Sequence, residues 1–257
     1  MNKFVIVDLE TTGQAPLKGD CVIEIGIVVV EEGKITEHFS SLFNPNIPIP
    51  AFITNLTGIK DEDVQDAPQF EQLAPKIASF FDDAYFVAHN VAFDLSFLNQ
   101  ELKQAGIKPL SQPILDTVEL ARILLPSVEG YKLSQLSDFF SLQHNDPHRA
   151  LSDAYVTAKL LLLLMDKLEQ LPYETIFQLQ KWESKFKSDL FHLFNQRLDR
   201  LAFQPVDRKD LEVYRGIALK KQLKSNEIEV NDKIPTIGTL FDDLFHTNGK
   251  LETVIDH

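Results

Sequence analysis

The sequence is poor in cysteine, in long apolar runs and in basic residues, and each shortage excludes a class of protein. Cys21 is the only cysteine among 257 residues, so no disulfide can form within the chain, and we expect a reducing, cytoplasmic location. No apolar run reaches the eighteen or so residues that a membrane-spanning helix needs, and no secretory signal is recognisable at the amino terminus. We therefore expect a globular protein without a membrane segment.

Positive charge is also scarce, with 25 basic against 38 acidic side chains and a formal net charge of -13. The deficit lies in residues 1–170, which carry 12 basic and 24 acidic side chains, whereas residues 171–257 carry 13 and 14. Such a chain cannot bind a polyanion through an extended positively charged surface. Any contact with nucleic acid must therefore be local or be mediated by bound cations. The phosphate-cradling motif GxxxxGK[ST] is absent, so this chain is not expected to hydrolyse ATP.

The apolar segments alternate between strand and helix patterns, which indicates an α/β fold. Three strand-like segments come first, and the turn at Glu32 and Gly33 joins the second and third as a hairpin. Helical segments then alternate with two more strand-like segments, so we predict a mixed five-stranded sheet with helices on both faces. The expected helices cover residues 70–83, 92–106, 117–126, 132–142 and 148–171, and the last two strands cover residues 84–90 and 113–117.

The chain changes character after residue 170, so we predict one domain over residues 1–170 and a mostly helical connector over residues 171–257. From Tyr173 to about Phe203 the apolar positions step by three and four, which predicts one unusually long amphipathic helix with an aromatic-rich stripe that needs a partner. The sequence then becomes polar and resembles a linker, apart from a small apolar cluster in TLFDDLF, residues 239–245.

The segment FVIVDLETTG, residues 4–13, ends an apolar strand on two acids. Residues two apart in a strand point to the same side, so Asp8 and Glu10 present both carboxylates together where the sheet ends. Close carboxylates repel unless a cation lies between them, and hard oxygen ligands favour Mg²⁺ or Mn²⁺. Two solvated acids beyond a strand would give the same pattern, so this short motif decides nothing alone.

The segment VAHNVAFDLSFLNQEL again places polar residues after an apolar strand. Asp94 falls in the first turn of the following helix, where an acid also has a structural role because it faces the positive end of the helix dipole. Phe93 and Phe97 lie on one face of that helix, a spacing more typical of a hydrophobic core than of a base-stacking platform.

The third candidate segment, HRALSDAYVTAKL, starts the last of these expected helices, after Asp146 and Pro147. His148 lies at the helix start, where the positive end of the dipole disfavours protonated imidazole and leaves the ring able to accept a proton. Asp153 lies five residues further on. His144 offers a histidine pair for a metal such as zinc, but no cysteine is near and the acids elsewhere favour oxygen ligands.

Taken together, the motifs DLETTG, HNVAFDLSFL and HRALSDA resemble those of the DEDDh exonucleases, the family of the proofreading subunit of bacterial DNA polymerase III. The resemblance covers residues 4 to about 168 and includes the secondary features IEIG at residues 23–26, LTGI at residues 56–59 and LDT at residues 115–117. It implies a ribonuclease H-like fold, in agreement with the predicted order of elements.

The resemblance also implies an activity and a set of site residues. Asp8, Glu10, Asp94 and Asp153 would hold two divalent ions, Mg²⁺ or Mn²⁺, and His148 would be the general base. The family reaction releases 5'-mononucleotides from the 3' end of single-stranded DNA or RNA. The residues implied to bind this substrate are Thr11 and Thr12, which would lie near the 3' hydroxyl, together with His89, Leu56 and Phe93, the last two as stacking or wedging residues.

Residues 162–194 resemble the corresponding region of the DinG-type helicase-like proteins of Gram-positive bacteria, in which an exonuclease precedes a superfamily 2 ATPase half. This resemblance implies that the chain is a fragment whose partner is an ATPase region of the same protein. Two alternatives stay open. One is a proofreading subunit or insert of a replicative polymerase, with TLFDDLF as a polymerase- or clamp-binding peptide. The other is a nucleic acid-binding module that has lost catalysis, although all five catalytic positions are filled.

Overall fold

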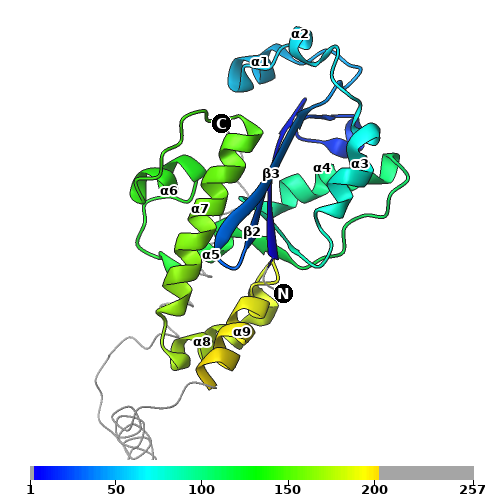
Figure 1. The fold of residues 1–257 in the computed structure, drawn as a ribbon. Coiled ribbons are helices and arrows are strands. Elements are labelled where there is room, and N and C mark those ends of the chain that lie inside the picture. Colours follow the sequence, from blue (N-terminus) through cyan, green and yellow to red (C-terminus); the bar gives the residue numbers. More distant parts are fainter. Residues whose placement is uncertain (1–2, 203–257) are drawn as a thin grey trace, which may run out of the picture. The chain divides into compact units, whose positions relative to one another are not determined.

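The computed structural model describes residues 3–202, which form a mixed sheet of five strands in the order β3-β2-β1-β4-β5 (Figure 1). The first three strands pair antiparallel, whereas β4 and β5 run parallel to β1. The predicted mixed five-stranded sheet is confirmed. The strands are β1 (Lys3–Thr11), β2 (Val22–Glu31), β3 (Lys34–Leu42), β4 (Tyr85–Ala88) and β5 (Ile114–Asp116).

Helices cover both faces of the sheet, as predicted (Figure 1). None of the helices within residues 3–202 is long and apolar enough to cross a membrane. The α-helices are α1 (Ala51–Thr57), α2 (Asp61–Val64), α3 (Phe70–Ser79), α4 (Val91–Gln104), α5 (Thr117–Leu124), α6 (Leu133–Phe139), α7 (Ala150–Glu169), α8 (Tyr173–Gln180) and α9 (Phe191–Ala202), and two short 3₁₀ helices are η1 (Pro16–Lys18) and η2 (Glu183–Lys185).

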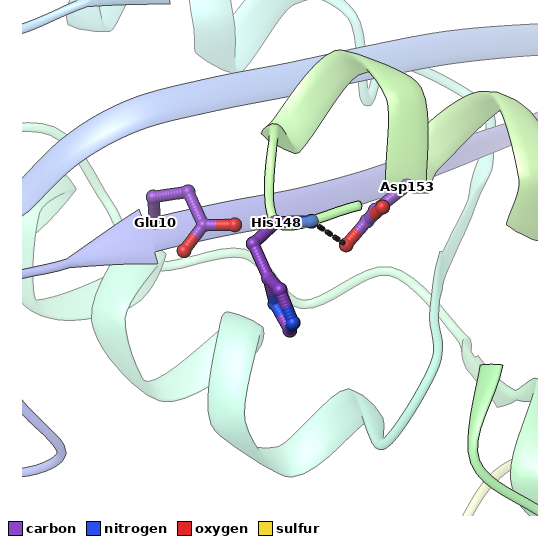
Figure 2. Close-up of side chains that lie close together, drawn as sticks. All are labelled: Glu10, His148 and Asp153. Atoms are coloured by element: carbon purple, nitrogen blue, oxygen red, sulfur yellow. Dashed lines mark hydrogen bonds between the residues drawn. The ribbon is translucent and has the colours of Figure 1, made fainter. Parts of the chain in front are cut away.

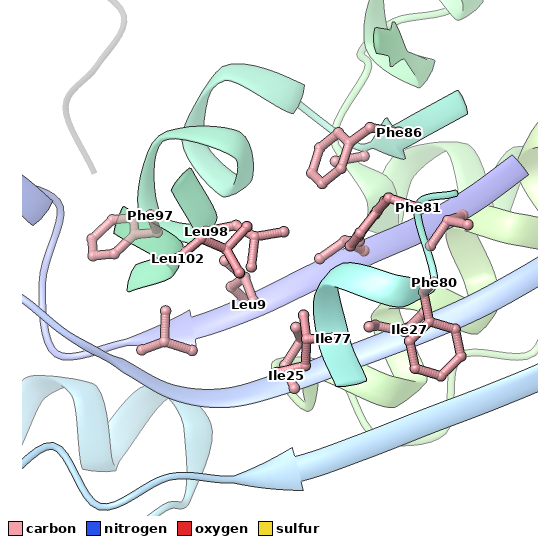
Figure 3. Packing of buried hydrophobic residues seen from close by; sticks show 14 of the residues in the cluster. Leu9, Ile25, Ile27, Ile77, Phe80, Phe81, Phe86, Phe97, Leu98 and Leu102 are labelled. Atoms are coloured by element: carbon pink, nitrogen blue, oxygen red, sulfur yellow. The ribbon is translucent and has the colours of Figure 1, made fainter. Parts of the chain in front are cut away.

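The main hydrophobic core lies between the sheet and helices α3 and α4 (Figure 3). Leu9, Ile25 and Ile27 from β1 and β2 point into it, and Ile77 and Leu98 meet them from the two helices. Alternate residues of each strand face this side because successive side chains of a strand point to opposite faces. The remaining residues, Asp8 and Glu10 among them, therefore belong to the other face.

Helix α7 packs on that other face, across β1 and β2, and α5 and α6 contact α7. Its amino-terminal end lies directly against Gly26 of β2, because a Cβ atom added at Gly26 would come within 2.2 Å of the carbonyl oxygen of Ala150. Glycine is needed at this position because no side chain fits between the strand and the helix. Gly26 is also the β2 partner of Asp8, so the start of α7 lies beside the first acidic motif.

The predicted single long helix over residues 173–203 is wrong. The structure has α8 and α9, separated by η2 and by an extended stretch at Phe186. The break has a physical reason, since Asp189 pairs with the edge strand β5. The Asp189 backbone N–H donates to the Ile114 carbonyl at 2.8 Å, and the Asp189 carboxylate accepts from the Ile114 N–H at 2.8 Å. A continuous helix could not supply these bonds to a sheet edge.

The apolar stripe of α8 and α9 has its partner inside the same protein. The described residues, 3–202, lie in one compact unit, and Ile176, Leu190 and Phe194 are completely buried. Polar contacts also join this region to β4, α5 and α7, through Gln196 to the Tyr85 hydroxyl, Ser188 to Glu119 and Arg197 to Glu169. The described part of the predicted connector thus packs on the preceding domain, and the TLFDDLF cluster lies outside the described residues.

Candidate active site

The candidate site lies at the carboxyl end of β1, where the neighbouring strand β4 has already ended. The last β1 and β4 pair is Ile6 with Val87, after which the chain turns at Asn90, in the left-handed region with φ of 75°, and enters α4. The Asp94 carboxylate on the first turn of α4 accepts the free Leu9 N–H at 3.1 Å. A separation of strands at the carboxyl end of a sheet is the usual place for a binding site in an α/β fold.

Asp8 and Glu10 project from β1 toward the face covered by α7, as the spacing predicts. Their cross-strand partners on β2 are Gly26 and Glu24, so Glu24 lies opposite Glu10 on the same face. A register shift follows between Glu10 and Thr11. A bulge of this kind bends a strand and re-aims its side chains, and bulges are frequent beside active sites.

The amino-terminal end of α7 brings the third motif to the same place (Figure 2). One ligand atom from each of Glu10, His148 and Asp153 lies within 4.8 Å of the others. His148 is exposed, whereas Glu10 and Asp153 are buried. The Asp153 carboxylate accepts the His148 backbone N–H at 3.3 Å with one oxygen and meets His144 Nε2 at 2.5 Å with the other. His144 therefore contacts the acid and does not form a separate histidine pair for zinc.

Crowding of carboxylates controls the electrostatics of the site. Burial, followed by the negative charge of Asp94, raises the pKa of Asp8 well above its ordinary value. Burial and then the charge of Asp153 raise the pKa of Glu10 to about 8, with Arg149 opposing the rise. Burial also raises the pKa of Asp94, although the backbone amides that its carboxylate accepts work the other way. Without a bound cation, a pKa of about 8 means that the Glu10 carboxyl is mostly protonated at neutral pH.

The set of donors fits divalent cations that prefer oxygen. Four carboxylates from β1, α4 and α7 meet in a partly desolvated place, and the raised pKa values of Asp8, Glu10 and Asp94 mean that added positive charge would be strongly favoured there. A cation would invert the local sign of the potential and release the retained protons.

The raised pKa of Glu10 predicts how the stability of the metal-free protein depends on pH. Folding raises this pKa from 4.5 to about 8, so the folded state binds more protons between these values and Glu10 contributes stability below pH 4.5 that is lost as the pH rises through about 8. In EDTA, the melting temperature should fall between about pH 6 and about pH 9, by less for Glu10→Gln than for the wild type. Identical slopes would contradict the assignment.

Two contacts that hold the site were missed by sequence reasoning. Glu24, noted only as part of IEIG, forms a two-pronged ion pair with Arg149 of HRALSDA. Asp116, noted only in LDT, accepts the N–H groups of Asn90, Val91 and Val118 at 3.2, 3.3 and 2.8 Å, and so caps α4 and α5 together. The available signal for both residues was an acid beside apolar strand residues. Their partners could not be predicted because they are distant in the sequence.

The polar residues expected to bind substrate already make internal contacts. The Thr12 hydroxyl accepts the Cys21 N–H at 2.9 Å, and the Thr11 hydroxyl donates to the Gly13 carbonyl at 2.6 Å. These bonds shape the loop after β1 and leave its backbone beside Glu10. His89 Nε2 donates to the Tyr131 carbonyl, and His89 Nδ1 lies 2.8 Å from Thr117 Oγ1. Burial lowers the pKa of His89 and so favours its neutral ring, and its two contacts tie the end of β4 to the loop before α6.

The two apolar residues expected to bind substrate differ in their surroundings. Leu56 on α1 is 51% exposed and, with Phe52 one turn earlier, presents apolar surface to solvent. Phe93 is partly buried against the main core, with its ring centroid 5.0 Å from that of Phe97, which is fully buried. The expectation that this pair belongs to the core therefore holds for Phe97, whereas Phe93 lies at the core margin.

Comparison with known families and sequences finds clear matches. Residues 5–161 match RNase_T, a family of exonucleases. Over 197 residues the chain is 51% identical to the "3'-5' exonuclease DinG" of Bacillus subtilis, covering 76% of this chain and 21% of that protein. Over 223 residues it is 37% identical to the protein of the same name from Staphylococcus aureus, covering 87% and 25%. The chain thus spans about a fifth to a quarter of the length of these curated relatives.

Solved structures with the same architecture include two DNA complexes. An exonuclease X structure "in complex with 5' overhanging duplex DNA" is 30% identical with a TM-score of 0.51 and covers 63% of this chain and 91% of that one. A zinc-bound complex of Escherichia coli ExoI with single-stranded DNA has a TM-score of 0.61 at 17% identity, and covers 70% of this chain and 43% of that one. The second likeness bears on the fold alone.

Proposed function

Because the chain belongs to the RNase_T exonuclease family, we propose that it hydrolyses nucleic acid from a free 3' end and releases 5'-mononucleotides. The family recognised from the three motifs is confirmed, as is the similarity to DinG. The observation that carries the proposed activity is the meeting of Glu10, His148 and Asp153 beside Asp8 and Asp94 at one end of the sheet.

In this proposal, Asp8, Glu10, Asp94 and Asp153 hold two divalent cations, Mg²⁺ or Mn²⁺. When bound, such ions supply the activation of the attacking water and neutralise charge on the phosphate and on the leaving 3' oxygen. The protein's part is to fix its carboxylates before substrate arrives. Asp94 is held by the Leu9 N–H, and Asp153 is held by His144 and the His148 N–H.

His148 has the role of general base, accepting the proton of the attacking water. Its ring lies close to the carboxylates of Glu10 and Asp153 but is exposed, so a water or a phosphate oxygen can reach it. The same proximity would also allow His148 to be a metal ligand. The two roles predict opposite results for metal binding by a His148 variant.

The proposed substrate is single-stranded DNA or RNA. The net charge of -13 gives no broad attraction for any nucleic acid backbone, so contact should be limited to a few nucleotides at the 3' end. The 3' terminal nucleotide would lie against the backbone of Thr11 and Thr12, with Leu56 and Phe93 available to stack or wedge against bases. Binding by this chain alone should be weak and sensitive to salt, because few basic side chains contribute.

We also propose that this chain is the exonuclease part of a longer protein with a helicase-like ATPase region. The support is that its curated relatives carry the name DinG and are four to five times longer than the matched portion. Location in the cytoplasm belongs to the same proposal. The proofreading and catalytically silent alternatives gain no support from any described contact.

The proposed activity predicts a clear polarity of digestion. Matched DNA and RNA oligonucleotides of one sequence, labelled at the 5' end, should be shortened one nucleotide at a time in Mg²⁺ or Mn²⁺. A blocked 3' end should stop digestion, whereas a blocked 5' end should not. EDTA should stop it completely. Products that shorten from the 5' end, or equal cleavage of 3'-blocked strands, would refute the proposal, and the DNA to RNA rate ratio would define the substrate.

A further inference from the structure

We propose that Glu24 and Arg149 form a positioning pair that fixes the orientation of His148. This inference rests on the proposed function, in which His148 takes the proton of the attacking water. Neither residue belongs to the predicted set of catalytic or metal-binding residues. Both act through the turn that carries His148 and not through contact with the substrate.

Glu24 reaches the turn with both carboxylate oxygens. Arg149 donates from Nη2 to Glu24 Oε1 at 2.7 Å and from Nε to Oε2 at 3.1 Å, and the Ala150 N–H donates to Oε2 at 3.0 Å. Glu24 is only 5% exposed, whereas the Arg149 side chain is about half exposed. A two-pronged bond between two planar groups fixes direction as well as distance. The carboxylate thus anchors both residues that follow His148.

His148 itself adopts a backbone conformation that needs such support. Its φ of 61° lies in the left-handed region, which is uncommon for residues other than glycine and persists only where the surroundings enforce it. The His148 N–H is bound to Asp153 on one side, and Arg149 is bound to Glu24 on the other. The turn is therefore held at both ends, while the imidazole is exposed.

The sheet sets the position of this anchor. Glu24 lies on β2 directly opposite Glu10, and two residues further along β2, Gly26 allows α7 to approach within contact of the strand. The pair of Glu24 and Arg149 therefore links the turn that carries His148 to strand β2, at the position directly opposite Glu10. Because a misplacement of about 1 Å at a reacting group can lower a rate by about 10²-fold, loosening this link should affect the chemical step more than substrate binding.

Three variants test the inference, each compared with the wild type in the oligonucleotide digestion assay. Arg149→Gln, Arg149→Lys and Glu24→Gln should each lower kcat by about 10- to 100-fold with KM changed by less than about two-fold. Arg149→Lys matters most, because it retains the positive charge near Glu10 but loses the two-pronged geometry. Calorimetric titration with Mn²⁺ should show metal affinity within about two-fold of the wild type.

Combination with His148→Ala gives the sharpest outcome. If the pair acts only through His148, adding Arg149→Lys to His148→Ala should cause no further loss of kcat. The inference would be overturned if the double variant lost kcat by the product of the two single losses, if Arg149→Lys were fully active, or if metal affinity fell greatly. Arg200→Gln, which removes an exposed arginine from its pair with Glu169, is the matched control and should retain full activity. An inactive wild type would instead refute the proposed function itself.

Discussion

Asp8→Asn should abolish exonuclease activity without weakening the fold. Asp8 lies among Glu10, Asp94 and Asp153, so its carboxylate would be one of the groups that hold the proposed cations. Loss of its charge should lower the rate by at least about 10³-fold, because metal-ion stabilisation of a transition state amounts to several kcal/mol and each 1.36 kcal/mol changes a rate tenfold. In the metal-free protein, however, burial and the neighbouring carboxylates disfavour the charged form of Asp8, so Asp8→Asn should melt at the same or a higher temperature.

Two measurements separate this result from simple misfolding. The Asp8→Asn variant should not shorten a 5'-labelled oligonucleotide. Mn²⁺ should raise its melting temperature by much less than it raises that of the wild type. His148→Ala is the companion variant, which should lose most of the rate but retain the stabilisation by Mn²⁺. Loss of that stabilisation would make His148 a ligand. An active Asp8→Asn variant would refute the assignment of Asp8 to the metal site.

A chain that ends at residue 170 should fail to fold stably, although the sequence motifs all lie before that point. Such a truncation removes α8 and α9 with the fully buried side chains of Ile176, Leu190 and Phe194, and it removes the polar contacts of this region with β4, α5 and α7. At about 1.5–3 kcal/mol for each fully buried large side chain, the loss is comparable with the whole stability of a typical domain, roughly 5–15 kcal/mol. It also removes the bonds from Asp189 to Ile114, which leaves the edge strand β5 open to aggregation.

The control is a chain that ends at residue 203, at the limit of the compact unit. Both chains should be compared by circular dichroism, thermal melting and size-exclusion chromatography at one concentration. We expect a cooperative transition for residues 1–203, and aggregation or loss of cooperativity for residues 1–170. Equal melting temperatures would show that α8 and α9 add little to the domain and would support a boundary at residue 170.

Local patterns were sufficient for the order of the elements, because periodicity and turn residues act over a few neighbours. The hairpin at Gly33, the start of the helix predicted over residues 70–83 and the position of His148 just before α7 agree with the structure, in which that helix ends at Ser79. The pattern failed for residues 173–202, where apolar spacing continued through a break. The break is imposed by the contact of Asp189 with β5, which lies 75 residues away in the sequence and leaves no local trace.

The sequence by itself determined the family, the candidate acids and His148, since these depend on residue identity and spacing within three short motifs. Only the tertiary structure decided that Glu24 anchors Arg149, that Asp116 caps two helices and that His144 contacts Asp153. Each of these contacts joins side chains from separate elements, and their distances depend on how the sheet twists and the helices dock. Spacing along the chain specifies which groups are available, whereas packing specifies which of them meet.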